Sequence, residues 1–149
     1  MLILSTVTNE LAETQGLAAR LAEELQGDEV IYLEGDLGSG KTSFAQGLIN
    51  GLGCKGIVTS PTFILQQEYR CSLPILHLDL YRLNQPMELE ELGLEEYYGE
   101  WILLIEWANL FSSFLPPPNI RIKFDYLSPT TRRIEISSSL DRLKSLKGV

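Results

Sequence analysis

Residues 35–42 read Gly-Asp-Leu-Gly-Ser-Gly-Lys-Thr and match the phosphate-binding pattern of Gly, four residues, Gly, Lys, and Ser or Thr. The run before them, residues 30–33, is β-rich and apolar without alternation, as in a strand buried on both faces of a sheet. Residues 44–52 after the loop have a helical pattern that Gly53 ends. A strand, a glycine loop and a helix in this order predict an α/β fold with a nucleotide site.

The residue types of this loop suit the chemistry of phosphate. Its glycines allow backbone N–H groups to point at phosphate oxygens, and the helix that follows adds the positive end of its dipole. Lys41 is expected to reach the β- and γ-phosphates, the Thr42 hydroxyl to bind Mg²⁺, and Ser43 to contact the α-phosphate. The motif therefore predicts a bound nucleotide with Mg²⁺, and we expect the nucleotide to be ATP.

Hydrolysis of ATP also needs a carboxylate on the metal side of the site, and two acids follow apolar runs. Asp79 ends the run 75–78, and Glu106 ends the run 101–105. Each has a plain structural alternative: a solvated chain exit for Glu106 and a surface ion pair with Arg82 for Asp79. The single histidine, His77, is more often a satisfied core or edge residue than a catalyst.

The remaining patterns predict one domain, residues 1–149, with a P-loop NTPase-like three-layer α/β fold. We expect a mixed, mostly parallel sheet flanked by helices and an antiparallel C-terminal hairpin around Ser128-Pro129. The expected helices are 9–26, 44–52, 86–94 and 140–146. The expected strands are 30–33, 57–59, 63–69, 75–80, 101–105, 120–126 and 133–137.

Charge and composition limit the partners and the compartment. The 149 residues carry 20 acidic and 12 basic side chains, a net charge of −8, which argues against a protein that binds nucleic acid by itself. The apolar residues 1–4 lack a basic flank, and no apolar run is long enough to span a bilayer, so we expect a cytoplasmic protein with no membrane association. Cys54 and Cys71 show no metal or redox spacing, and we expect reduced thiols without a function.

Four motifs in this order and spacing resemble the small bacterial ATPase family TsaE, also called YjeE. They are the phosphate loop, Ser60-Pro61-Thr62-Phe63, His77-Leu78-Asp79-Leu80-Tyr81-Arg82-Leu83, and Ile105-Glu106-Trp107. The family serves the synthesis of threonylcarbamoyladenosine in tRNA. The resemblance covers most of the chain, including Thr14 in the first helix, and weakens after Leu115.

The resemblance implies roles for individual residues. Lys41, Asp79 and Glu106 are the implied catalytic residues, and Thr42 and Glu106 the implied metal ligands, with Asp79 positioning metal or attacking water. Residues 60–63 form an implied switch-like loop near the γ-phosphate. The implied nucleotide-binding residues are Asp36, Leu37, Gly38, Ser39, Gly40, Lys41, Thr42, Ser43, Trp107 and Arg132.

Two points of the resemblance stay open. Arg132 and Arg133 both qualify as the arginine that approaches the nucleotide near the C-terminal hairpin. Ala108 stands where the family usually has Pro, so the path of the chain after Trp107 can differ. The family acts with TsaB and TsaD, where TsaD transfers the threonylcarbamoyl group, so tRNA is expected to be contacted only through these partners.

Two other functions compete with a partner-dependent ATPase. A small-molecule kinase would need an arginine-bearing lid, and residues 88–100 contain no arginine. A nucleotide-gated binding module, in which hydrolysis is incidental, cannot be distinguished by motifs. A translational-type GTPase is disfavoured because the chain lacks the Asn-Lys-x-Asp signature for guanine.

Overall fold

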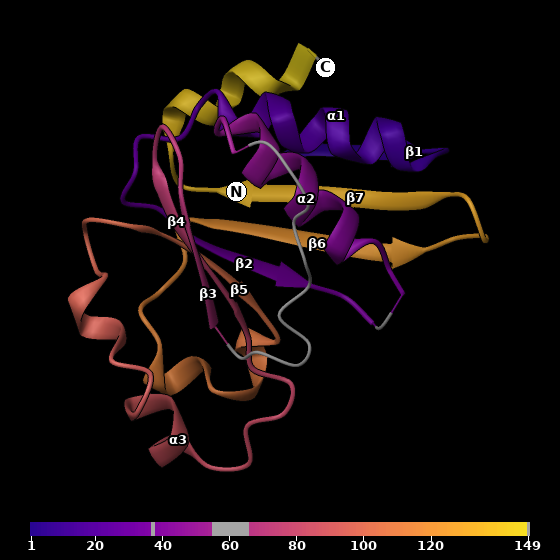
Figure 1. Ribbon diagram of the computed structural model, residues 1–149. Coiled ribbons are helices and arrows are strands. Elements are labelled where there is room, and N and C mark those ends of the chain that lie inside the picture. Colours follow the sequence, from indigo (N-terminus) through magenta and orange to yellow (C-terminus); the bar gives the residue numbers. More distant parts are fainter. Residues whose placement is uncertain (37, 55–65, 149) are drawn as a thin grey trace.

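The computed structural model describes residues 1–36, 38–54 and 66–148, which form a seven-stranded sheet of order β1-β7-β6-β2-β5-β4-β3 (Figure 1). The four central strands, β6, β2, β5 and β4, are parallel, and the outer pairings β1–β7, β7–β6 and β4–β3 are antiparallel. The strands are β1 (Leu2–Thr8), β2 (Val30–Glu34), β3 (Gln66–Arg70), β4 (Pro74–Asp79), β5 (Ile102–Glu106), β6 (Ile120–Tyr126) and β7 (Arg132–Ser138).

Helical layers cover both faces of the sheet and confirm the predicted three-layer architecture (Figure 1). One face carries α1 (Leu11–Ala22), α2 (Lys41–Gly51) and the 3₁₀ segment η4 (Asp141–Gly148). Among the described residues, the other face carries short helical pieces, which are α3 (Pro86–Glu90), η1 (Leu94–Glu96), η2 (Ala108–Leu110) and η3 (Ser112–Phe114). Two separate apolar clusters lie between these layers and the sheet, so the central strands are buried on both sides, as their continuous apolar runs predicted.

The two long helices pack closely because α2 presents glycine where it meets α1. A Cβ atom at Gly47 would lie 2.5 Å from the Gln15 carbonyl oxygen, and one at Gly51 would lie 2.9 Å from the Ala22 Cβ. Small residues at these two positions allow the backbones to approach. This contact fixes α2, and with it the phosphate loop at its start, against the rest of the molecule.

Most sequence-based boundaries agree with the structure to within a few residues. The predicted helix 9–26 is α1, the hairpin is β6–β7, and the tail is a 3₁₀ segment rather than an α-helix. β1 was not predicted; its residues pair with β7 from Leu2 to Thr8, and that partner lies more than 120 residues further along the chain. The expected strand 57–59 and the start of 63–69 lie outside the described residues.

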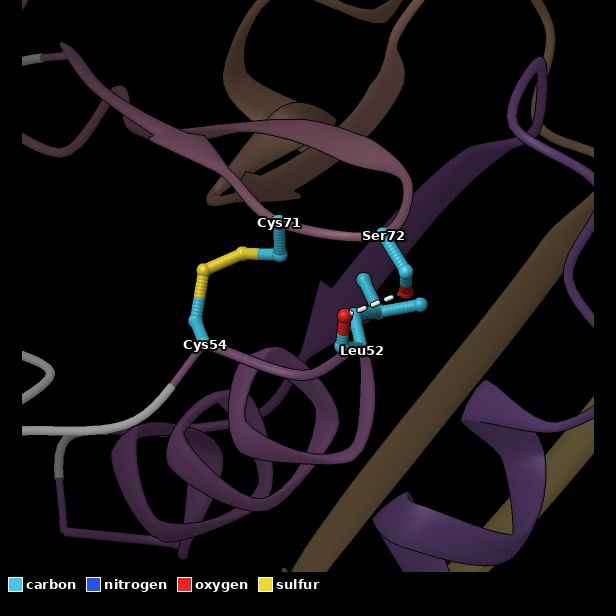
Figure 2. Close-up of a disulfide and its surroundings, with 4 residues drawn as sticks. All are labelled: Leu52, Cys54, Cys71 and Ser72. Atoms are coloured by element: carbon cyan, nitrogen blue, oxygen red, sulfur yellow. Dashed lines mark hydrogen bonds between the residues drawn. A yellow bond between two sulfur atoms is a disulfide. The ribbon is translucent and has the colours of Figure 1, made fainter.

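The prediction of two reduced cysteines was wrong, because Cys54 and Cys71 form a disulfide (Figure 2). Their Cα atoms are 5.1 Å apart, within the range that a disulfide spans. The bond joins the chain just after α2 to the turn between β3 and β4. Beside it, the hydroxyl of Ser72 donates to the Leu52 carbonyl oxygen (Figure 2). The backbone N–H of Ser72 donates to the same oxygen at 3.0 Å. Sequence spacing could not indicate the pair, since only the fold brings the two segments together.

None of the helices in the described part of the chain is long and apolar enough to cross a bilayer.

Candidate functional site

A cleft of about 220 Å³ lies where the loop after β2 enters α2, beside the carboxyl ends of β4 and β5. This edge of a parallel sheet is the usual place for ligands in open α/β folds. Nine predicted site residues line it: Gly38, Gly40, Lys41, Thr42, Ser43, Asp79, Glu106, Trp107 and Arg132. Leu11, at the start of α1, lines it too and was missed, since an apolar residue at a helix start carries no motif.

The loop has the tight geometry that its glycines permit. A Cβ at Gly35 would lie 2.7 Å from the Ser39 Oγ and 2.9 Å from the Phe124 carbonyl oxygen, so no larger residue fits. The first α-helical hydrogen bond of α2 runs from the Phe44 N–H to the Gly40 carbonyl oxygen at 3.1 Å. The N–H groups of Lys41, Thr42 and Ser43 therefore precede the helical ladder and are available to an anion.

Two further residues of the predicted loop set lie around the cleft rather than in it. Ser39 is buried, and its Oγ has no hydrogen-bond partner among the described residues, so this polar atom is unsatisfied beneath the loop. Asp36 lines a neighbouring cleft that it shares with Trp107. Leu37 and the motif at 60–63 lie outside the part of the chain that the structure describes.

Lys41 is nearly buried and points back across its own loop. Its Nζ donates a hydrogen bond to the Gly35 carbonyl oxygen at 2.7 Å and lies 4.0 Å from the centroid of the Trp107 ring. Burial lowers the pKa of Lys41 from its ordinary value, and the negative charges of Glu106, Asp79 and Asp36 partly oppose that shift. The ammonium group is thus poorly hydrated, and three carboxylates are close enough for their charges to act on it.

The two acids at the ends of β4 and β5 are neighbours in the sheet. Asp79 and Glu106 stand opposite each other in the parallel register of these strands, and both side chains are buried. The Asp79 Oδ1 accepts a hydrogen bond from the Tyr81 N–H at 3.0 Å, and the Glu106 Oε2 lies 2.7 Å from the His77 Nε2. Burial raises the pKa of Asp79, with Glu106 adding to the rise and the Tyr81 N–H opposing it. Because both side chains are buried, Glu106 is not a solvated residue where the chain leaves the sheet, and Asp79 is not part of an ion pair on the surface.

Trp107 follows Glu106 and has a left-handed backbone conformation, with φ of 62°, which is rare for a residue other than glycine. Its ring packs on the Tyr81 ring, with centroids 4.9 Å apart. The Nζ of Lys41 also lies over the Trp107 ring. The next residue, Ala108, is buried and begins η2. The chain therefore turns sharply after β5 without a proline, and this turn directs the indole toward the cleft.

The structure distinguishes the two candidate arginines. Arg132 lines the cleft, and its Nη2 donates to the Gly38 carbonyl oxygen at 3.1 Å. Its Nη1 donates to the carbonyl oxygens of Ser128 at 2.6 Å and Thr131 at 3.0 Å, so the guanidinium joins the β6–β7 turn to the phosphate loop. Arg133 is exposed on β7.

The oxygen atoms of the cleft fit a magnesium ion that is shared with phosphates. Within the described residues, no group of three or more His, Cys, Asp and Glu side chains could hold a metal alone. Mg²⁺ usually takes one or two carboxylates, with waters and substrate phosphates completing the shell. The Thr42 hydroxyl and the carboxylates of Glu106 and Asp79 line the same cleft and supply that partial set.

Comparison with known proteins identifies relatives over most of the chain. The family profile described as "Threonylcarbamoyl adenosine biosynthesis protein TsaE" matches residues 8–134. A protein of Bacillus subtilis strain 168 named "tRNA threonylcarbamoyladenosine biosynthesis protein TsaE" is 39% identical over 136 residues, which are 90% of this chain and 85% of that protein. A Rickettsia bellii protein of the same name is 38% identical, covering 93% and 97% of the two chains. The crystal structure of Bacillus subtilis YdiB superimposes with a TM-score of 0.80 at 33% identity, covering 98% of this chain and 93% of that one.

Proposed function

The chain belongs to the TsaE family of tRNA threonylcarbamoyladenosine biosynthesis, and we propose that it serves this pathway as an ATPase that binds ATP and Mg²⁺. One observation carries the proposal. Lys41 and Thr42 at the start of α2 line the same cleft as Asp79 and Glu106 at the ends of β4 and β5. A phosphate-binding helix start opposite two carboxylates is the arrangement that metal-assisted phosphoryl transfer requires.

In the proposed reaction, water attacks the γ-phosphorus in line with the departing ADP oxygen. Lys41 and the N–H groups of the loop stabilise the negative charge on the transferred phosphoryl group. Asp79 orients the attacking water, and Thr42 and Glu106 would hold the Mg²⁺ that accompanies the nucleotide. Mg²⁺ would supply charge neutralisation between the β- and γ-phosphates. Trp107 closes the site beside Lys41 and limits access of bulk water.

We propose further that the activity depends on TsaB and TsaD homologues and is weak in the isolated protein. Arg132 is the arginine at the cleft, and its guanidinium is engaged by three backbone carbonyl oxygens. Charge stabilisation by an arginine would then need a rearrangement that a partner supplies. The net charge of −8 supports contact with tRNA only through these partners.

Calorimetric titration of Mg-ATP into the wild type, Lys41→Ala and the control Lys144→Ala tests nucleotide binding. Lys144 is half-exposed and pairs with Asp141 on η4, away from the cleft. Loss of the charged hydrogen bonds should weaken binding by roughly 10–100-fold in Lys41→Ala and leave Lys144→Ala unchanged. Equal affinity of Lys41→Ala and the wild type would contradict the proposal.

A second experiment addresses the partners and the role of hydrolysis. Pull-down of TsaB and TsaD homologues, with and without ATP, should recover them in a nucleotide-dependent manner, and recovery in neither condition would refute the partner assignment. Glu106→Ala should abolish both hydrolysis and tRNA modification. If Glu106→Ala stopped hydrolysis and still supported full modification, the protein would act as a nucleotide-gated module instead.

A further inference from the structure

His77 makes a contact that the function above does not use. It lies within β4 with only 1% of its surface exposed, and its Nε2 is 2.7 Å from the Glu106 Oε2. In the parallel register His77 stands opposite Leu104, two residues before Glu106, so the bond runs diagonally between β4 and β5. His77 and Asp79 share one face of β4 because side chains alternate along a strand. His77, Asp79 and Glu106 therefore lie on the same face of the sheet, and the two acids line the cleft.

The contact fixes the roles of the ring atoms. A Glu106 carboxylate can only accept a hydrogen bond, and in that pairing the Nε2 of His77 is the donor. The other ring nitrogen, Nδ1, is buried and has no partner among the described residues. A buried polar atom without a partner is unfavourable, and an apolar side chain at this position would avoid it. The imidazole, unlike an apolar side chain, can form the hydrogen bond to Glu106.

From this geometry we infer that His77 is a positioning residue that holds the Glu106 carboxylate in one orientation toward the cation of Mg-ATP. The bond occupies Oε2 and leaves Oε1 as the oxygen that can serve a ligand in the cleft that Glu106 lines. Without it, a glutamate side chain would rotate about its terminal torsion, which has no sharp preference. Hydrogen-bonded partners of this kind orient metal-binding carboxylates in many proteins. The inference rests on the proposed Mg-ATP site.

Two substitutions of similar size separate the hydrogen bond from packing. His77→Leu keeps an apolar side chain of comparable volume in the strand and removes the donor. His77→Gln keeps an N–H donor at about the distance of Nε2 from the backbone. Leu76→Met, a volume-conserving change at the next residue of β4, alters the apolar cluster on the opposite face and is the control.

The measurements are ATP affinity by calorimetry, in EDTA and in Mg²⁺, and Mn²⁺ binding to the protein with a non-hydrolysable ATP analogue by electron paramagnetic resonance. In His77→Leu, affinity in EDTA should stay at the wild-type value, while the gain on adding Mg²⁺ and the affinity for Mn²⁺ should fall by roughly 10–100-fold. His77→Gln should recover most of that loss, and Leu76→Met should show none. A purely structural role would instead lower both ATP affinities together.

The outcomes distinguish this inference from the proposed function. If the wild type shows no Mg²⁺-dependent ATP binding, the proposed function fails. If the wild type shows it and His77→Leu keeps the full Mg²⁺ gain, the positioning role fails and the proposed function stands. Should His77→Leu not fold, His77→Asn replaces it, because the asparagine amide is too short to reach Glu106. If His77→Asn and His77→Gln gained equal ATP affinity on adding Mg²⁺, that result would also overturn the inference.

Discussion

The Nζ of Lys41 lies between the Gly35 carbonyl oxygen, at 2.7 Å, and the face of the Trp107 indole, at 4.0 Å from the ring centroid. A cation on an aromatic face gains about 0.5–2 kcal/mol, depending on how far it is desolvated. The lysine is thus held inside its own loop by a short charge-assisted hydrogen bond and by the indole face. A phosphate entering the cleft would compete with the Gly35 carbonyl oxygen and the indole for the Lys41 ammonium. The surroundings of the Trp107 ring would then change.

Trp107 should therefore report nucleotide binding by fluorescence. The chain has two tryptophans, and the other, Trp101, packs edge-on against Tyr97, outside the cleft. Trp101→Phe should retain the emission change on adding Mg-ATP, because Trp107 remains beside Lys41. Trp107→Phe should lose it while keeping measurable affinity in calorimetry. A nucleotide-dependent signal that persists in Trp107→Phe would show that the indole does not respond to the cleft.

Asp79→Asn should separate stability from function. The Asn side chain can still accept the Tyr81 N–H and no longer carries a charge next to Glu106 in a buried site. Because the raised pKa reflects a carboxylate that folding destabilises, the variant should gain about 1 kcal/mol of unfolding free energy at pH 7. Its ATP hydrolysis in the presence of partners should fall at least about tenfold. Urea denaturation and phosphate release measure the two effects, and a less stable variant would contradict the electrostatic argument.

The placement of the glycine loop and of both acids at one cleft could be predicted from sequence because their signals are local. The loop pattern is contiguous, and each acid follows an apolar strand, where parallel strands place it at the ligand-binding edge. The contact of His77 with Glu106 could not be predicted in this way, because it depends on the register between β4 and β5. Which of the two arginines lies at the cleft, Arg132 or Arg133, could not be predicted either. It depends on which side chains of β7 point toward the loop and on the position of β7 beside that loop. The Cys54–Cys71 pair depends on the placement of the β3–β4 turn against the end of α2.

Substitution of two helical glycines by alanine should have opposite effects. Gly16 in α1 is exposed, and a Cβ there has no neighbour within 4 Å, so Gly16→Ala should raise the unfolding free energy by about 0.5–1 kcal/mol through helix propensity. Gly47 in α2 faces the Gln15 carbonyl at 2.5 Å, so Gly47→Ala must separate the helices and should cost roughly 1–3 kcal/mol. Chemical denaturation compares the two. Stabilisation by both would show that α1 and α2 are not in close contact.

The Cys54–Cys71 bond should contribute to stability by closing a loop in the unfolded chain. The two residues are 17 positions apart, and loops of this size give about 3 kcal/mol in the chain-entropy description. Adding dithiothreitol should lower the melting temperature of the wild type and leave that of the double variant Cys54→Ala/Cys71→Ala unchanged. If dithiothreitol shifted both proteins equally, its effect would not come from this disulfide.

Glu29 should make stability depend on acid pH. Its buried carboxylate accepts the N–H groups of Gln26, at 2.7 Å, and Gly27, at 2.9 Å, and pairs with Arg142, which ties η4 to the end of α1. Burial by itself would raise the pKa of Glu29, but these hydrogen bonds outweigh burial and lower it. A lowered folded pKa means that the stabilisation is fully present above the unfolded value, near pH 4.3, and is lost as the pH falls through the folded value.

Glu29→Gln should therefore be less stable than the wild type by roughly 1–3 kcal/mol at pH 7, and the difference should shrink as the pH falls below about 4. Glu23→Gln is the matched control, because Glu23 is exposed and pairs with Arg20 on the surface of the same region. Its effect should stay within about 0.5 kcal/mol at every pH. Urea denaturation of the three proteins between pH 3 and pH 7 measures the differences. A gap between Glu29→Gln and the wild type that stayed constant with pH would mean that the charge of Glu29 is not what holds η4.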